Sequence, residues 1–236
     1  FRFGFIDPYW MAASCIDEAL RQIVAVGGSI EKAALLDNFC WGNPDKPDRL
    51  GGFGRPSYGC HDIAKAYGVA FISGKDRFYN EFSLHGKSTA IPGTLLISAI
   101  SVMDDVHKSV SMYAKEAGDL IYLVGKTRDE LGGSHYYDLH GALGNQVPKV
   151  YPQEAKKIFT ALSKATEKGL LGGAHDCSDG GLAVALAVMV FSGGLGAEIF
   201  LGQAPYASAA QRNDFLLFAE SNSRFVVEVA RENQKK

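Results

Sequence analysis

Hydrophobic and polar positions follow a helical period in two stretches of the first half of the chain. Apolar residues recur at helical spacing over 11–26, between a helix-start pair at 7–8 and two glycines at 27–28. A second helix is predicted over 56–67, ending at Gly68. Short apolar runs predict buried strands, and the glycine-rich or charged segments between them predict loops. The strands are expected at 33–36, 69–72 and 92–102, and the loops at 43–45, 51–54 and 73–77.

A similar alternation restarts in the second half of the chain. An amphipathic helix is predicted over 153–168, and an apolar helix over 182–191. Further strands are expected at 120–124, 197–201 and 224–229, with a polar segment at 129–144. Because strands and helices alternate throughout, the sequence predicts an α/β or α+β fold. The charged stretch 103–116 is the expected boundary between two domains, 1–108 and 109–236.

Composition narrows the class of protein. Of the 236 residues, 47% are hydrophobic and 21% are charged, which is typical of a globular protein. The formal net charge is −2 and no stretch is strongly basic, so nucleic acid is not an expected partner. No apolar run reaches the length that spans a membrane. The four cysteines are scattered without a C-x-x-C pair, which favours a reduced, cytoplasmic setting over a zinc or disulfide scaffold.

The segment 173–182 concentrates the candidate chemistry. Asp176, Ser178 and Asp179 precede two glycines and an apolar run, which predicts a strand that turns into a helix. The first N–H groups of a helix attract anions, and glycines let an anion approach them. Carboxylates beside a phosphate indicate a divalent cation, so this pattern points to Mg²⁺-phosphate binding. The alternative is structural: Ser178 or Asp179 caps the helix and the glycines form the turn.

A second candidate is the segment 73–76, Ser-Gly-Lys-Asp, which follows a predicted strand. α/β proteins place sites at the carboxyl ends of strands, although the earlier glycine of a P-loop is missing here. A solvated turn is the alternative interpretation. The six histidines show no metal-ligand spacing, and Ser178 lacks the G-x-S-x-G pattern of a hydrolase nucleophile. Glu18, alone, is a solvated helix glutamate beside the apolar stripe.

The segment 175–182, HDCSDGGL, resembles the HDxSDGGL motif of the formylglycinamide ribonucleotide amidotransferases, also called phosphoribosylformylglycinamidine synthases. Further matches to this family follow in order along nearly the whole chain. They are at 7–19, 37–44, 74–81, 118–134 and 220–224. The resemblance implies the two-domain fold of the aminoimidazole ribonucleotide synthetase-like superfamily. In that fold an N-terminal α/β domain joins a central barrel and a C-terminal α/β domain follows. The chain resembles the second of two homologous halves.

The resemblance also implies an activity. The family uses ATP and Mg²⁺ to convert formylglycinamide ribonucleotide into its amidine in purine biosynthesis. The ammonia comes from glutamine at a glutaminase domain or subunit. The implied partners are therefore the ribonucleotide substrate, the glutaminase and the first half of the synthetase. Two alternatives remain open: a nucleotide-stabilised half without catalysis of its own, and another ATP-using member of the superfamily.

Site residues follow from the same resemblance. Glu18, Gln22 and Asp176 are the implied Mg²⁺ ligands and Ser178 a nucleotide contact, with Gln22 standing where the family has Asn. A second site is implied where the predicted strand 33–36 ends and in the predicted loop 73–77. It comprises Asp37 and Gly74 for the nucleotide, and Lys75, Asp76 and Arg77 for the substrate.

The chain begins at Phe1 without a methionine and ends soon after a strand-like run, so we expect it to be part of a longer polypeptide. An isolated half is expected to have no turnover, because half of an active site loses most of the positioning that catalysis needs. It is also expected to form a homodimer through the first domain, since an uncovered sheet edge invites association.

Overall fold

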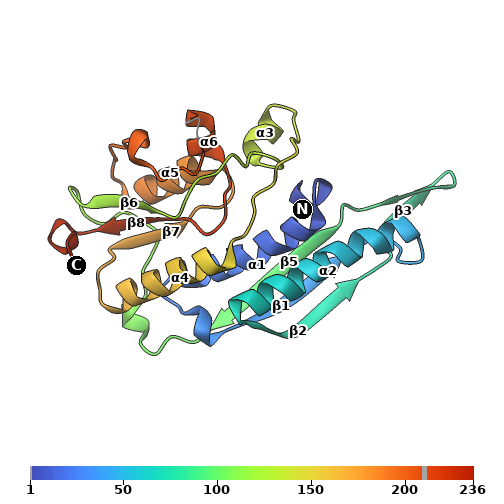
Figure 1. The fold of residues 1–236 in the computed structure, drawn as a ribbon, viewed down its shortest axis with the longest axis horizontal. Helices are drawn as coiled ribbons and strands as arrows, with labels where there is room; N and C mark the ends of the chain where they lie inside the picture. Colours follow the sequence, from blue (N-terminus) through green and yellow to red (C-terminus); the bar gives the residue numbers. More distant parts are fainter. Residues whose placement is uncertain (1, 209–211) are drawn as a thin grey trace.

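The computed structural model describes residues 2–208 and 212–236 of the chain. Its first half contains α1 (Pro8–Ala25), β1 (Ala33–Cys40), α2 (Pro47–Tyr67), β2 (Ala70–Arg77) and β5 (Thr94–Ser101). These strands form one sheet in the order β2-β1-β5, with β1 parallel to β2 and antiparallel to β5. The helices α1 and α2 cover one face of this sheet (Figure 1). A hairpin of β3 (Glu81–Leu84) and β4 (Lys87–Ala90) connects β2 to β5 and extends beyond the sheet (Figure 1).

The second half is built around a smaller antiparallel sheet. Its strands are β6 (Leu120–Val124), β7 (Gly173–Asp176) and β8 (Phe225–Val229), in the order β6-β8-β7. The helices are α3 (His135–Leu139), α4 (Pro152–Glu167), α5 (Gly181–Gly193) and α6 (Asn213–Phe218). Short 3-10 helices lie at Arg2–Phe5, Ile30–Lys32, Val106–Lys108, Leu201–Gln203 and Arg231–Asn233. None of the described helices is both long and apolar enough to cross a membrane.

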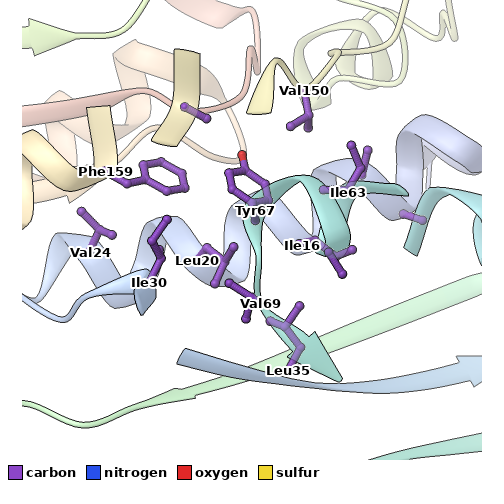
Figure 2. Packing of buried hydrophobic residues seen from close by; sticks show 14 of the residues in the cluster. Ile16, Leu20, Val24, Ile30, Leu35, Ile63, Tyr67, Val69, Val150 and Phe159 are labelled. Carbon is purple, nitrogen blue, oxygen red and sulfur yellow. The ribbon is translucent and has the colours of Figure 1, made fainter. Parts of the chain in front are cut away.

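The helix α1 is the centre of the molecule, and its sequence explains both its limits and its burial. Asp7 caps it by accepting a hydrogen bond from the Tyr9 N–H at 2.9 Å, and Pro8 occupies the first turn, as predicted. Most of its side chains are buried, because the sheet, the neighbouring helix α2, α4 and β7 all pack against it. Figure 2 shows Ile16 and Leu20 of α1 in the cluster that joins Leu35 of the sheet to α4.

The two halves share one hydrophobic core. Phe159 of α4 stacks on Tyr67 of α2 with ring centroids 5.7 Å apart, and also contacts Phe225 of β8 edge to face. Both aromatic residues of the stack are labelled in Figure 2. The cluster that contains them runs from α1 to β8, so the first sheet and the second sheet are packed against the same helices. This places α1 directly beside β7 and the turn that follows it.

The helix α2 begins earlier than the sequence predicted. It starts at Pro47 and not at Pro56, and it includes the glycine-rich segment 51–54 that was predicted as a loop. Phe53 explains the difference: its ring packs 5.0 Å from Phe39 and 5.9 Å from Trp41. Burial of an aromatic cluster outweighs the weak helix propensity of glycine.

Two other sequence predictions are corrected, and one element was not predicted. The predicted loop 73–77 is a continuation of β2, because its backbone pairs with β1 as far as Arg77. The predicted strand 197–201 is absent from the described residues: that segment is largely exposed and irregular up to the short helix at Leu201. The hairpin of β3 and β4 was not predicted, although its turn residues His85 and Gly86 have the positive φ values, 50° and 78°, that tight hairpins require.

Candidate functional site

The predicted nucleotide residues converge where α1 meets the end of β7. Asp176 is the last residue of β7, and Ser178 lies in the turn that follows. Glu18 projects from α1 towards them: its carboxylate lies beside Ser178 and interacts electrostatically with Asp176. Gln22 lies one turn further along α1 and is exposed. The structure therefore brings Glu18, Asp176 and Ser178 together, although they are far apart in the sequence.

A buried arginine that the sequence analysis missed lies within this group. Arg21 is only 2% exposed. Its Nη2 donates to Ser178 Oγ at 3.1 Å, its Nε lies 3.4 Å from Asp176 Oδ2, and its Nη1 donates to Asn222 Oδ1 at 2.9 Å. Ser178 Oγ also donates a short hydrogen bond to Asp176 Oδ2. One guanidinium thus contacts the end of β7, the following turn and the loop before β8.

Arg21 is held in turn by Asp17, which is completely buried four residues earlier on the same helix. Asp17 Oδ2 accepts from Arg21 Nη1 and from the Ser223 N–H, and Asp17 Oδ1 accepts from Ser223 Oγ and the Tyr67 hydroxyl. This carboxylate is therefore fully hydrogen-bonded, as a buried charge requires. The network joins α1 and α2 of the first half to the loop before β8 of the second half.

Burial, hydrogen bonds and neighbouring charges shift the pKa values of Glu18 and Asp176 in opposite directions. Burial alone would raise the pKa of Asp176, but His175, the Arg21 charge and Ser178 together lower it to about 2. Burial raises the pKa of Glu18, and the nearby Asp179 and Asp176 carboxylates raise it further, against the opposing effects of Arg21 and Ser178. The carboxylates of Asp17, Glu18 and Asp176 therefore surround the single buried charge of Arg21. A divalent ion bound nearby would offset their remaining negative charge.

Mg²⁺ fits the donors present. Hard cations bind carboxylate and amide oxygens, which are the atoms that Glu18, Asp176 and Gln22 supply. Oδ2 of Asp176 is occupied by Ser178 and Arg21, whereas Oδ1 lies 3.6 Å from His175 Nδ1, beyond hydrogen-bond length. Asp176 can therefore offer Oδ1 to a cation while Oδ2 keeps its contacts with Ser178 and Arg21.

The turn after β7 differs from the structural alternative, in which Ser178 or Asp179 would cap the helix. The helix α5 is capped neither by Ser178 nor by Asp179: its N-cap is Gly180, with φ of 75° and no side-chain capping bond of its own. The Gly180 N–H donates instead to Glu220 Oε1 at 2.9 Å, and the His135 N–H donates to the same oxygen at 2.9 Å. Glu220 therefore places a carboxylate at this helix start, where the helix dipole favours negative charge.

Glu220 also belongs to a group of three potential ligand residues. His135, Asp179 and Glu220 each bring one ligand atom within 4.8 Å of the others. His135 Nδ1 lies 3.1 Å from Glu220 Oε1 and 3.6 Å from Asp179 Oδ1. Because the Glu220 oxygen already accepts two backbone N–H groups, its charge is used to hold the α3 and α5 turns together.

The second predicted site is only partly assembled. Asp37 of β1 pairs with Gly74 of β2, so the predicted neighbourhood of these two residues is confirmed. A side chain at Gly74 would place its Cβ 2.0 Å from Asp37 Oδ1, which explains the glycine. Burial, followed by the charge of Asp76, raises the pKa of Asp37. Because side chains alternate along a strand, Lys75 and Arg77 lie on the opposite face of the sheet from Asp37 and Asp76.

The residues that the sequence analysis missed carried one usable signal. Asp17 and Arg21 are four residues apart, on the same stripe of α1 as the buried Leu20 and Val24. Charged residues within an apolar helical stripe must be paired when they are buried. That pattern predicts an ion pair, but it does not reveal that Asn222 and Ser223 complete it.

Comparison with known proteins supports the same fold. Models of the AIR synthase related protein family match the chain with the N-terminal domain over residues 1–103 and the C-terminal domain over residues 116–236. The chain is 34% identical over 238 residues to "Phosphoribosylformylglycinamidine synthase subunit PurL" of Methanocaldococcus jannaschii, covering 100% of this chain and 32% of that protein. It therefore spans about a third of the length of this curated relative.

Two solved structures from Thermotoga maritima confirm the predicted two-domain α/β architecture. PurL complexed with FGAR matches with a TM-score of 0.79 and 22% identity, covering 99% of this chain and 37% of that chain. PurL complexed with ATP matches with a TM-score of 0.72 and 23% identity, covering 98% of this chain and 34% of that chain. The chain belongs to the AIR synthase related protein family, and the N-terminal and C-terminal domains of that family follow each other along it.

Proposed function

We propose that this chain is part of an ATP-dependent C–N ligase, a phosphoribosylformylglycinamidine synthase of purine biosynthesis. The observation that carries the proposal is the convergence of Glu18, Asp176 and Ser178 in a chain whose curated relative is named as the PurL subunit of that enzyme. The reaction would phosphorylate the amide oxygen of formylglycinamide ribonucleotide with ATP. Ammonia would then attack the activated carbon and displace phosphate, leaving the amidine.

In this proposal Glu18 and Asp176 hold Mg²⁺ and Ser178 contacts the nucleotide. Mg²⁺ would offset the negative charge of the phosphates. Gln22 is exposed beside them, and its longer side chain brings the same type of oxygen as Asn. Asp37, Gly74, Lys75, Asp76 and Arg77 remain candidates for the wall of a nucleotide or substrate site. Because side chains alternate along the strand, Asp37 and Asp76 lie on one face of the sheet, and Lys75 and Arg77 lie on the other.

One face of the first sheet carries an exposed apolar surface to which a partner could bind. The face of β2-β1-β5 that α1 and α2 leave uncovered carries apolar side chains: Ile72 is 64% exposed, and Leu96 and Ile100 are each 58% exposed. Exposed apolar surface of this kind marks an interface. We propose that it receives the homologous half of the synthetase or, in the isolated chain, a second copy. A glutaminase would supply ammonia, and the cytoplasm is the proposed location.

A nucleotide-stabilised half without its own catalysis is the second candidate. It is favoured by the position of the Asp17–Arg21 network, which lies between the two halves of the chain and beneath the nucleotide residues. A nucleotide bound there would strengthen the contact between the halves by mass action, whether or not it is turned over.

Nucleotide titration and turnover measured side by side separate the candidates. Isothermal titration of the 236-residue chain with Mg-ADP and Mg-ATP should show binding. Asp176→Asn should weaken it, whereas the matched surface change Asp104→Asn should not. The 104 carboxylate is an exposed partner of Lys32. No binding by the unmodified chain would overturn the proposed site.

The turnover arm uses ammonia-dependent ATP hydrolysis and amidine formation. Binding without turnover in the chain alone, with turnover restored when the homologous half and glutaminase are added, supports the ligase. Binding with no effect of Asp176→Asn on turnover in that reconstituted enzyme would support the structural candidate. Light scattering during size exclusion tests self-association, and a chain that stays monomeric at high concentration contradicts the homodimer.

A further inference from the structure

We propose that Arg21 is a positioning residue of the nucleotide site, which holds Asp176 and Ser178 in the orientation that a metal-bound nucleotide needs. The inference rests on the proposed function, and deepens it by assigning a role to a buried charge that does not itself contact the nucleotide. Arg21 comes from α1, whereas both residues that it orients follow β7.

The contacts of Arg21 show how it would act. Nε lies 3.4 Å from Asp176 Oδ2, and Nη2 donates to Ser178 Oγ at 3.1 Å. Because Ser178 in turn donates to the same Oδ2, the arginine, the serine and the aspartate form a closed triangle. Rotation of either side chain would break at least one of these contacts. The triangle therefore fixes which Asp176 oxygen is engaged by the protein and which is available to a cation.

The arginine is itself anchored on its far side. Nη1 donates to Asp17 and, at 2.9 Å, to Asn222 Oδ1. Asp17 is 0% exposed and is fixed by Tyr67 and Ser223. The planar guanidinium can serve these partners at once, whereas a lysine ammonium in the same place has a single nitrogen and cannot span them.

Charge gives the second reason for an arginine here. Asp17 and Asp176 flank the guanidinium, and Glu18 adds a third carboxylate nearby. Without a buried cation these groups would repel one another and move apart until a metal ion arrived. With Arg21 in place they can be held in position beforehand, and preorganisation lowers the cost of binding. Partners that orient metal ligands in this way typically change metal affinity about 10- to 100-fold when mutated.

The test uses Arg21→Lys, which keeps the charge, and Arg21→Met, which removes it, in the 236-residue chain. Affinity for Mg-ADP is measured by titration calorimetry, and affinity for Mn²⁺, with and without ADP, by electron paramagnetic resonance. We expect Arg21→Lys to lose about 10-fold in affinity and Arg21→Met about 100-fold. Leu35→Ala serves as the control: it removes a core side chain away from the site and should lower stability, with nucleotide affinity within about twofold of the unmodified chain.

All affinities are compared at temperatures where each variant is folded, so a loss of stability alone cannot produce the result. If neither Arg21 variant folds, Asn222→Ala removes one anchor of the guanidinium without touching Asp176 or Ser178. It should weaken Mg-ADP binding about threefold to tenfold, below the range for a ligand partner. Binding by the unmodified chain with no change in any folded variant overturns the role of Arg21 and leaves the proposed function standing. No binding by the unmodified chain overturns the proposed site and this inference with it.

Discussion

Asp17→Asn should destabilise the chain severely, although it replaces only one non-hydrogen atom of the side chain. Asp17 is completely buried and forms the ion pair that compensates Arg21. Breaking a buried pair from one side typically costs about 3–5 kcal/mol, because the remaining charge stays buried without its partner. We expect the lower end, about 3 kcal/mol, because Arg21 still lies beside Asp176 in the variant. For a chain of this size that loss corresponds to a fall in Tm of about 6–12 °C.

The measurement is urea denaturation followed by circular dichroism and by fluorescence, with coincident transitions as the check for two-state behaviour. Asp104→Asn is the matched control, because it removes the same charge from an exposed pair with Lys32 at 2.6 Å. Exposed pairs contribute about 0–1 kcal/mol, so this variant should be nearly neutral. If the two variants differ by less than about 1 kcal/mol, the network around Asp17 does not contribute as the structure indicates.

Tyr67→Phe extends the test to the hydrogen bond that the Tyr67 hydroxyl donates to Asp17. A hydrogen bond to a charged acceptor is worth about 1.5–3 kcal/mol, and one to a neutral acceptor about 1 kcal/mol. The effect of Tyr67→Phe should therefore be smaller in the Asp17→Asn background, with a coupling free energy of about 1 kcal/mol. Additive effects would show that the hydroxyl does not depend on the Asp17 charge.

The remaining predictions concern packing, pH and substrate binding. Gly59→Ala would place a Cβ 2.6 Å from the Tyr9 carbonyl oxygen, where α1 and α2 cross, and should cost about 1–3 kcal/mol in the same urea assay. Gly54→Ala has no described atom within 4 Å of its Cβ and should stabilise α2 by about 0.5–1 kcal/mol; the opposite order of the two variants contradicts this packing. Because the pKa of Asp176 is lowered to about 2, the stability that it contributes is complete above the ordinary carboxyl pKa of about 4 and is lost as the pH falls through 2. Asp176→Asn should therefore flatten the unfolding free energy between those pH values, and an unchanged acid profile would rule this out. In the complete enzyme Lys75→Ala should raise the KM for the ribonucleotide about 10- to 100-fold if it contacts the phosphate, and an unchanged KM and kcat would remove it from the site.

The local pattern of the sequence was sufficient wherever one segment decides its own structure. The first helix was predicted from Asp7-Pro8, its apolar stripe and the glycines at 27–28, and the structure has it at Pro8–Ala25. The strand predicted at 120–124 is β6 with the same limits. In these cases the cap, the periodicity and the stop signal all lie within the segment, so the neighbouring chain need not be known.

Other elements depended on partners that the local pattern does not contain. The polar segment 73–77 looks like a loop, yet it is a strand because its backbone groups are paired with β1. The glycines at 51–54 are helical because Phe53 enters an aromatic cluster with Phe39 of β1 and with Trp41, which follows that strand. The apolar segment 197–201 forms no strand among the described residues, since no neighbouring strand pairs with it there. Strand formation needs a partner, and a single-sequence pattern does not name one.

Part of the candidate site could likewise be predicted from the sequence, and part only from the tertiary structure. The sequence by itself predicted Asp176 and Ser178 as site residues from their crowding before a helix, and Glu18 and Gln22 from a family resemblance. Only the tertiary structure revealed that Arg21 joins Asp176 to Ser178 and that Glu220 accepts the Gly180 N–H at the start of α5. A sequence motif reveals only residues that lie close together along the chain. A buried ion pair forms because charges must be paired in the low dielectric of a protein core. That core exists only after α1, β7 and the loop before β8 have packed together.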